Sequence, residues 1–286
     1  SAATVAAGRG HQVTLFEAGH EVGGQFNLAK VIPGKEEFHE TIRYFKVQIE
    51  KTGVELRLNT KASREQLERE GFEEVIVATG VVPRALKIEG SDAPQVLSYA
   101  EVLRGAPVGE RVAVIGAGGI GFDVSEFLLK PPHQPQPLTD WQREWGIDAN
   151  PNYISEGGMQ PAEVHAPVRE IYLLQRKTTP LGAGLGKTSG WVHRAQLKKH
   201  GVRMLRGVQY KAVTDEGIWV ELAGHDQLLR VDTVVVCAGQ ESVKDLMPAA
   251  QEKTLANYHI IGGAKLASEL DAKRAIREGA EIAANL

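Results

Sequence analysis

The chain has 286 residues, of which 42% are hydrophobic and 24% charged, so it is long enough to bury the cores of two domains. Its net charge of −3 argues against a nucleic-acid or membrane surface as the main partner, because both favour a basic excess. The single cysteine, Cys237, excludes an internal disulfide, a CxxC redox pair and a cysteine-ligated zinc or iron–sulfur site on this chain alone.

The amino-terminal segment has the composition of a helix that runs into a strand. Residues 1–9 lack a helix-start signal, so we expect them to be the last turns of a helix that begins before Ser1. The strand expected over residues 12–16 ends in the carboxylate of Glu17. In a dinucleotide-binding unit such an acid binds a ribose hydroxyl and follows the Gly-rich loop by about 20 residues, which puts that loop before Ser1. Glu17 and the Gly23-Gly24 pair are therefore candidates for binding an adenine dinucleotide, and a surface carboxylate beside a plain turn is the alternative.

The strand expected over residues 74–78 is apolar and leads into Thr79, Gly80 and then Pro83. Flavoproteins with two nucleotide domains resemble this pattern where the chain crosses between the cofactors. By itself the strand is equally good as plain core. It gains value because a second apolar strand, expected over residues 233–237, ends in a similar small-residue turn.

A Gly-rich turn follows the apolar strand expected over residues 111–115 and opens a segment of helical spacing over 122–129. Its fingerprint residues are Gly116, Gly118, Gly119, Ile120 and Gly121. The first glycine permits the tight turn, the second lets a pyrophosphate approach the backbone, and the last lets helix and strand pack closely. Because the helix amino terminus adds free N–H donors, we predict dinucleotide binding here, with a plain Gly-rich turn as the alternative.

Between residues 130 and 167 the composition changes to prolines among Gln, Asn and Gly. We expect an insertion or extended loop over about 131–167, without a regular helix or a central strand.

Nucleotide preference is predicted from the end of the strand over residues 170–174. An acid there would bind the ribose 2′-hydroxyl of NAD and repel a 2′-phosphate. Arg176 and Lys177 follow the strand instead, and a guanidinium suits a phosphate. This favours NADPH, and ordinary solvated charges are the alternative, because the spacing from Gly121 is well beyond the usual interval unless the insertion loops out of the fold.

The Gly-rich segment 182–188 resembles a phosphate-binding P-loop, but only three residues separate Gly182 from Gly186 where that motif needs four, so we do not expect an ATPase. The nine histidines show no metal-ligand spacing, and no metal site is expected. His193, with Arg194 beside it, is kept as a candidate at the nucleotide site. The chain has no apolar run of bilayer length and no signal-peptide pattern, so the cytoplasm is the expected compartment.

Short β-branched runs therefore recur with helical stretches between them, which predicts an α/β fold. The expected strands cover residues 12–16, 54–58, 74–78, 111–115, 170–174, 233–237 and 259–261. A unit of strand, helix, strand and small-residue turn occurs twice, so we expect two Rossmann-like three-layer dinucleotide-binding domains.

Several stretches resemble the carboxyl-terminal half of the bacterial NADPH-dependent 2,4-dienoyl-CoA reductase family. The matching stretches are residues 23–27, 32–38, 116–123, 144–148, 174–177, 184–194 and 269–272. In that family an amino-terminal barrel carries FMN, a four-iron cluster and the acyl-CoA site, and the carboxyl-terminal half binds FAD and NADPH. The resemblance implies a truncated FAD-binding domain over 1–104 and 240–286, with an NADP-binding domain over 105–239 inserted between its parts.

The resemblance also implies which residues meet each cofactor. FAD would be bound by Glu17, Gly24, Gln25, Lys35, Ala62, Gly80 and Gly263. NADPH would be bound by Gly116, Gly118, Gly119, Ile120, Gly121, Arg176, Lys177, His193 and Arg194. Only hydride transfer from NADPH to FAD would take place on this chain, because the proton donor, FMN, the 4Fe-4S cluster and the acyl-CoA pocket would belong to the missing barrel, its expected partner. Lys265 departs from the family, whose members have an acid near this place beside the flavin.

Two alternatives stay open from the sequence. One is another barrel-linked flavin oxidoreductase, of the enoate reductase or amine dehydrogenase type. The other is a non-catalytic NADP-sensing or partner-docking module, in which the glycines at 116, 118 and 121 would serve binding alone.

Overall fold

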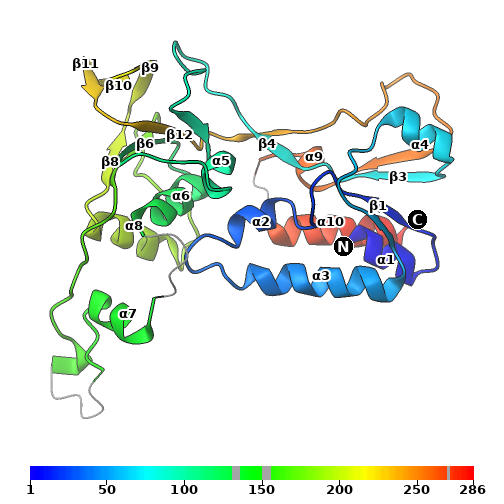
Figure 1. The fold of residues 1–286 in the computed structure, drawn as a ribbon, viewed down its shortest axis with the longest axis horizontal. Coiled ribbons are helices and arrows are strands. Elements are labelled where there is room, and N and C mark those ends of the chain that lie inside the picture. The colour runs from blue at the N-terminus through cyan, green and yellow to red at the C-terminus, as the bar shows by residue number, and fades with distance from the viewer. Residues whose placement is uncertain (131–135, 150–155, 269–270) are drawn as a thin grey trace. The chain divides into compact units, whose positions relative to one another are not determined.

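The computed structural model describes residues 1–130, 136–149, 156–268 and 271–286 (Figure 1). Residues 131–135 and 150–155 of the expected insertion, and residues 269–270 of the family resemblance, lie outside this description. The chain divides into two compact units. The first unit comprises Ser1–Lys30, Gly34–Arg84 and Gly239–Leu286, and the second comprises Val31–Pro33 and Ala85–Ala238.

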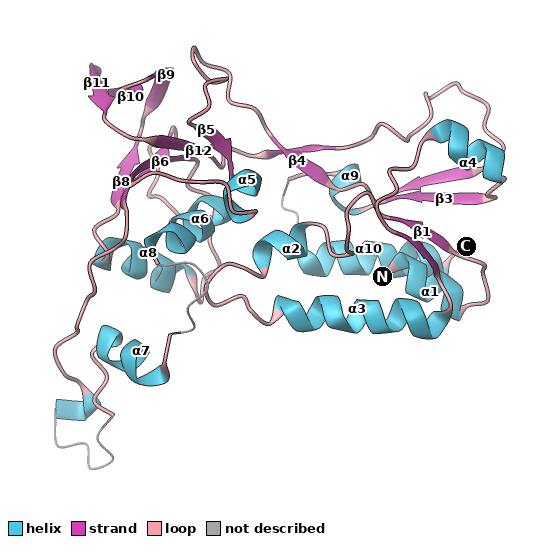
Figure 2. Cartoon of the chain, viewed as in Figure 1, coloured by secondary structure: helices cyan, strands magenta, loops and turns pink. Residues whose placement is uncertain are grey.

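The first unit is built from short paired strands and helices (Figure 2). Its helices are α1 (Ala2–Gly8), α2 (Gln25–Ala29), α3 (Phe38–Thr52), α4 (Arg64–Glu70), α9 (Gly262–Lys265) and α10 (Ala272–Ala284). Its strands are β1 (Thr14–Phe16), β2 (Glu55–Arg57), β3 (Glu74–Val77), β4 (Val81–Pro83), β13 (Gln240–Ser242) and β14 (Asn257–Ile260). The pairs β1–β2 and β3–β14 are parallel, and β4–β13 is antiparallel.

One apolar cluster joins the two parallel strand pairs of the first unit. Val75 and Val77 of β3 are buried in it together with Leu67 and Ala264, and Phe16 at the end of β1 packs against it. Helix α1 packs on α3 and α10. The residues that follow β1 and β2 leave from one edge of their pair, and those that follow β3 and β14 leave from one edge of theirs, because the two strands of a parallel pair run in the same direction.

The second unit contains a parallel sheet and an antiparallel one. Its strands are β5 (Val96–Ser98), β6 (Arg111–Ile115), β7 (Glu170–Gln175), β8 (Arg203–Arg206), β9 (Gln209–Thr214), β10 (Gly217–Leu222), β11 (His225–Leu229) and β12 (Thr233–Val236). Its helices are α5 (Tyr99–Leu103), α6 (Gly119–Leu129), α7 (Leu138–Trp145), the 3-10 turn η1 (Glu156–Gly158) and α8 (Gly190–Lys199). The five-stranded sheet has the order β5-β12-β6-β7-β8 with every pair parallel, and the three-stranded sheet has the order β11-β10-β9.

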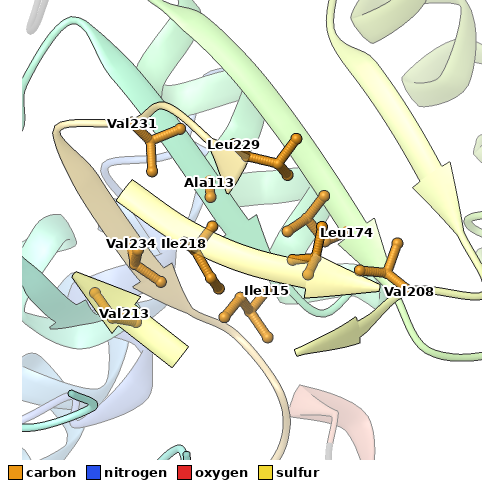
Figure 3. Packing of buried hydrophobic residues seen from close by; sticks show 10 residues of the cluster. Ala113, Ile115, Leu174, Val208, Val213, Ile218, Leu229, Val231 and Val234 are labelled. Carbon is orange, nitrogen blue, oxygen red and sulfur yellow. The ribbon is translucent and has the colours of Figure 1, made fainter. Parts of the chain in front are cut away.

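The core of the second unit lies between its two sheets (Figure 3). Ile115 of β6, Leu174 of β7 and Val234 of β12 pack there against Ile218 and other buried residues of the three-stranded sheet. Helices α5 and α6 contact the five-stranded sheet, and α8 packs on α6. Strand β6 lies in the middle of the five-stranded sheet, and its apolar residues are buried because the three-stranded sheet covers one face and α6 the other. The expected α/β fold is confirmed.

The boundary between the units falls after Arg84, and not after residue 104 as expected for the first domain. The reason is strand β5, which pairs with β12 and so joins residues 96–98 to the sheet of the second unit. Helix α5 follows directly, and its Ser98–Glu101 capping box starts it at the end of that strand.

The expectation that the Pro-rich insertion contains no regular helix was wrong for α7. Pro137 precedes this helix as its N-cap and Gly146 ends it with φ 66°, so no proline falls inside. Helix α7 is fastened to α8 by the buried carboxylate of Glu144, which accepts hydrogen bonds from Gln136 at 2.5 Å and Gln196 at 2.8 Å. Burial would raise the pKa of Glu144, but these bonds and the nearby charges of Lys130 and His200 hold it below its ordinary value.

Candidate functional site

The turn after β6 can be made only by glycine. Gly116 has φ 105°, and a Cβ on it would lie 2.7 Å from the carbonyl oxygen of Cys237. Its N–H donates to the carbonyl of Leu174 at 2.9 Å, which ties the turn to the neighbouring strand β7. Backbone strain and close packing both exclude a larger residue here. The chain therefore leaves β6 in the tight turn that the sequence predicted.

Helix α6 begins in direct contact with that turn. A Cβ on Gly121 would lie only 1.8 Å from the carbonyl oxygen of Gly116, and its next neighbour would be the side chain of Leu173 on β7 at 3.5 Å. The missing side chain allows the first turn of the helix to rest on the sheet. The helix amino terminus is thus fixed at the carboxyl end of β6.

The amino terminus of α6 is exposed. A Cβ on Gly118 or on Gly119 would meet no heavy atom within 4 Å, and both residues are exposed. Gly118 is the N-cap and offers no side chain, no side-chain cap bond forms, and the first turn contains no acidic residue. The N–H groups around Gly119 and Ile120 are therefore available to an anion, and the helix dipole favours negative charge there. These residues fit the pyrophosphate of a dinucleotide.

Two cations lie at the end of β7, next to β6 in the sheet. Arg176 and Lys177 are exposed, and neither forms an ion pair with another residue in the described part of the chain. Gln175 donates its side-chain amide to the carbonyls of Lys177 at 3.0 Å and Thr179 at 2.8 Å, and so shapes the turn. Burial raises the pKa of Tyr210 to about 12, and the charge of Arg176 acts against this rise. The strand end carries no carboxylate.

A third cation, Arg206, stands beside these two and was missed in the sequence. It is the last residue of β8, and its partner in the β7–β8 register is Gln175. No motif connects it with Arg176, because parallel pairing of distant strands is a tertiary feature.

The two candidates on α8 make contacts within the chain. His193 Nδ1 lies 2.7 Å from Glu126 Oε1. Glu126 is about two helical turns after the amino terminus of α6. Arg194 donates to the carbonyl of Gly182 at 3.1 Å. Gly182 has φ 71° and faces the ring of Phe122, so the Gly-rich segment 182–188 packs against α6. These contacts hold α8 against α6 and against the Gly-rich segment.

In the first unit, Glu17 follows β1 and uses one carboxylate oxygen in its own turn. Its Oε1 accepts the N–H of Gly19 at 2.6 Å, and its N–H donates to the carbonyl of Arg57 at 2.9 Å. Glu17 is half-buried at the carboxyl end of the β1–β2 pair. This is the edge at which a parallel α/β sheet binds ligands.

Three further candidates come together near β4. Gly24 has φ 49° and is the N-cap of α2, and Gly80 has φ 76°. A Cβ on either glycine would meet no heavy atom within 4 Å. Gln25 Nε2 lies 3.4 Å from the carbonyl of Val81, which ties the start of α2 to the segment that follows Gly80. The backbone is exposed to a ligand at both glycines.

Ala62 and Gly263 lie at the apolar cluster that joins β1 and β3. Ala62 packs against it, and Gly263 precedes its buried member Ala264. The carbonyl of Gly263 accepts the hydroxyl of Ser242 at 2.6 Å. The sequence candidates near Glu17 and Gly80 are thus grouped around one core.

Two lysines singled out in the sequence, Lys35 and Lys265, also lie in the first unit. Lys35 is half-buried in the turn before α3, where its carbonyl accepts the N–H of Phe38 at 3.1 Å. Lys265 is exposed at the end of α9. Within the described residues, no group of three or more His, Cys, Asp or Glu side chains is placed to hold a metal ion. None of the helices in the described ranges has both the length and the apolar character that a membrane span requires.

Comparison with known proteins identifies the family of this chain. The chain matches the family model of pyridine nucleotide-disulphide oxidoreductases over residues 1–262. A metal reductase of Desulforamulus reducens is 30% identical over 266 residues, which are 88% of this chain and 37% of that protein. A cinnamate reductase of Clostridium sporogenes is 28% identical over 286 residues, which are 100% of this chain and 37% of that protein.

A solved structure of a reductase is also similar to this chain over its whole length. The chain is similar to a 2-naphthoyl-CoA reductase in complex with 2-naphthoyl-CoA, with a TM-score of 0.79 and 26% identity. That match covers 100% of this chain and 38% of the other. The chain therefore spans less than two fifths of the length of these relatives.

Proposed function

This chain belongs to the pyridine nucleotide-disulphide oxidoreductase family, and on that premise we propose that it is the reductase part of an NADPH-dependent flavoprotein. FAD binds to the first unit and NADPH to the second. One observation carries the proposal. The exposed amino terminus of α6 lies at the same edge of the sheet as the end of β7. That strand end carries two cations, Arg176 and Lys177, that form no ion pair within the described residues, and it carries no carboxylate.

In the second unit, backbone amides and side chains divide the binding of NADPH. The N–H groups around Gly119 and Ile120 hold the pyrophosphate, because Gly118 lets it reach the backbone. Arg176 and Lys177 take the 2′-phosphate, and the absence of a carboxylate at this strand end removes the group that would repel it. His193 and Arg194 support this site through their contacts with Glu126 and with the carbonyl of Gly182.

In the first unit, the residues grouped around the apolar core hold FAD. The free carboxylate oxygen of Glu17 accepts a ribose hydroxyl, while its other oxygen is kept in place by Gly19. Gly24 and Gly80 expose backbone to the cofactor, and Gln25 fixes their spacing through Val81. Ala62, Gly263 and Lys35 complete the set, as the family resemblance implies.

The cofactors supply hydride transfer from the nicotinamide to the flavin, and the chain supplies binding and orientation. The described residues contain no cysteine pair, since Cys237 is the single cysteine of the sequence and is buried. Electrons that reach the flavin therefore leave this chain by a route other than a thiol pair.

For the whole protein we propose a partner barrel that carries FMN and a 4Fe-4S cluster and reduces an unsaturated fatty acyl-CoA, in the manner of the 2,4-dienoyl-CoA reductases. The support is the similarity to a 2-naphthoyl-CoA reductase and the short share of that chain, 38%, that this one spans. A second candidate substrate is a free enoate. The match to a cinnamate reductase over 100% of this chain favours it.

The test uses the full-length protein in anaerobic stopped-flow absorbance. NADPH should bleach the flavin band much faster than NADH at equal concentration, and a dienoyl-CoA should then reoxidise the enzyme while cinnamate should not. Reoxidation by cinnamate alone would move the proposal to the enoate type. A protein that binds no flavin, or that NADH reduces as well as NADPH, would remove the NADPH-dependent reductase from consideration.

A further inference from the structure

The turn that carries Arg176 and Lys177 is joined to the segment after β8 by two backbone hydrogen bonds. The N–H of Gly207 donates to the carbonyl of Lys177 at 3.0 Å, and the N–H of Val208 donates to the carbonyl of Gln175 at 3.0 Å. Arg206 directly precedes Gly207, and it is the register partner of Gln175 in the β7–β8 pair. Three cations from two strands are therefore held at one corner of the five-stranded sheet.

These cations lack the partners that other arginines of the same unit have. Arg203, at the opposite end of β8, lies 3.0 Å from Glu170 and 2.6 Å from the hydroxyl of Tyr172. Arg111 is paired with Asp232. Arg206 is exposed and, among the residues that the structure describes, forms no ion pair. Like charges gathered without a counter-charge destabilise the folded chain, so an anion that binds among them gains from all three.

We propose that Arg206 is a specificity-determining residue that completes a three-cation site for the 2′-phosphate of NADPH. The inference rests on the proposed function. A phosphate offers several acceptor oxygens, and a turn that supplies cations from β7 alone can approach it from one direction. Arg206 approaches from the neighbouring strand and contacts a second side of the same group. The preference for NADPH over NADH is thus set jointly by the ends of β7 and β8.

The test measures binding by titration calorimetry with adenosine 2′,5′-bisphosphate and with adenosine 5′-monophosphate, on the full-length protein. Arg206→Gln should weaken the bisphosphate about tenfold and leave the monophosphate unchanged, because only the first ligand carries the 2′-phosphate. Arg203→Gln is the matched control, since it removes the same charge from the other end of the same strand. It should change neither affinity.

A second variant and the unaltered protein separate the outcomes. Arg206→Glu should reverse the preference between the two ligands, and a thermal melt of each variant reports whether it folds. If the unaltered protein binds neither nucleotide, both the proposed function and this inference fail. If it prefers the bisphosphate and Arg206→Gln keeps that preference, or loses both ligands equally, the role of Arg206 is overturned while the function stands.

Discussion

Gly121 faces the carbonyl oxygen of Gly116 so closely that a methyl group on its Cα would lie 1.8 Å from that oxygen. Because Gly121 has no side chain, helix α6 can lie directly on the turn after β6, and the position of the helix amino terminus depends on this close approach.

We expect Gly121→Ala to push α6 away from the sheet, because the opposing atom belongs to the backbone. The free energy of unfolding should fall by about 1–3 kcal/mol, and NADPH affinity should fall with it. Gly119→Ala is the control for stability alone, since a Cβ there meets no atom within 4 Å. Urea unfolding of both variants checks this, and equal stability of the two would contradict the close contact.

Arg176 should govern the choice of nucleotide. Arg176→Gln is expected to raise KM for NADPH about tenfold and to leave KM for NADH unchanged, because it removes a charged donor to the 2′-phosphate. Steady-state reduction of an artificial acceptor by each nucleotide measures this. Arg230→Gln, which removes an exposed cation paired with Glu216 at 3.2 Å in the same unit, should leave both constants unchanged. A parallel rise for NADH would show that Arg176 does not recognise the phosphate.

Gly80 tests the approach of FAD to the backbone. Gly80→Ala and Gly53→Ala place a side chain at φ 76° and φ 72°, both in open space, so each should cost about 1–2 kcal/mol of stability. Gly53 ends α3, away from the candidate site, and only Gly80→Ala should lower the FAD content of the purified protein. Absorbance spectra and thermal melts give the two readouts. Equal flavin content in both variants would remove Gly80 from the site.

The docking of α7 should depend on pH through Glu144. The pKa of this carboxyl is lower in the folded state than in the unfolded chain, so its contribution is present above the unfolded pKa and is lost as pH falls through the folded one. Melting curves from pH 6 downward should show Tm falling on the acid side. In Glu144→Gln this loss should be smaller, and an unchanged acid profile would show that the carboxylate does not stabilise the contact.

The strands that the sequence predicted well are those whose burial leaves a local pattern. Strand β6 was found at its observed bounds because its residues form one apolar run. Strand β10 was missed because it belongs to an antiparallel sheet in which the exposed Trp219 interrupts the apolar residues that are buried. Helix α7 was missed because the prolines around it were counted as if they lay inside it.

The candidate site divides in the same way. The tight turn at Gly116 and the close packing at Gly121 follow from local spacing, and the structure has both. The contacts of His193 and Arg194 could not be predicted, because they depend on how α8 packs against α6. Arg206 could not be placed before the order of β7 and β8 in the sheet was known.

Cys237 is the one thiol of the sequence; it is buried beside Gly116, and burial raises its pKa well above the ordinary range. Within this chain, a single buried thiol is a convenient background for site-specific labelling. A cysteine introduced at an exposed position of each unit, such as Arg43 in the first and Arg230 in the second, can carry a fluorophore or spin label without first removing the native thiol. The distance between the two units in solution, with and without nucleotide, then becomes directly measurable.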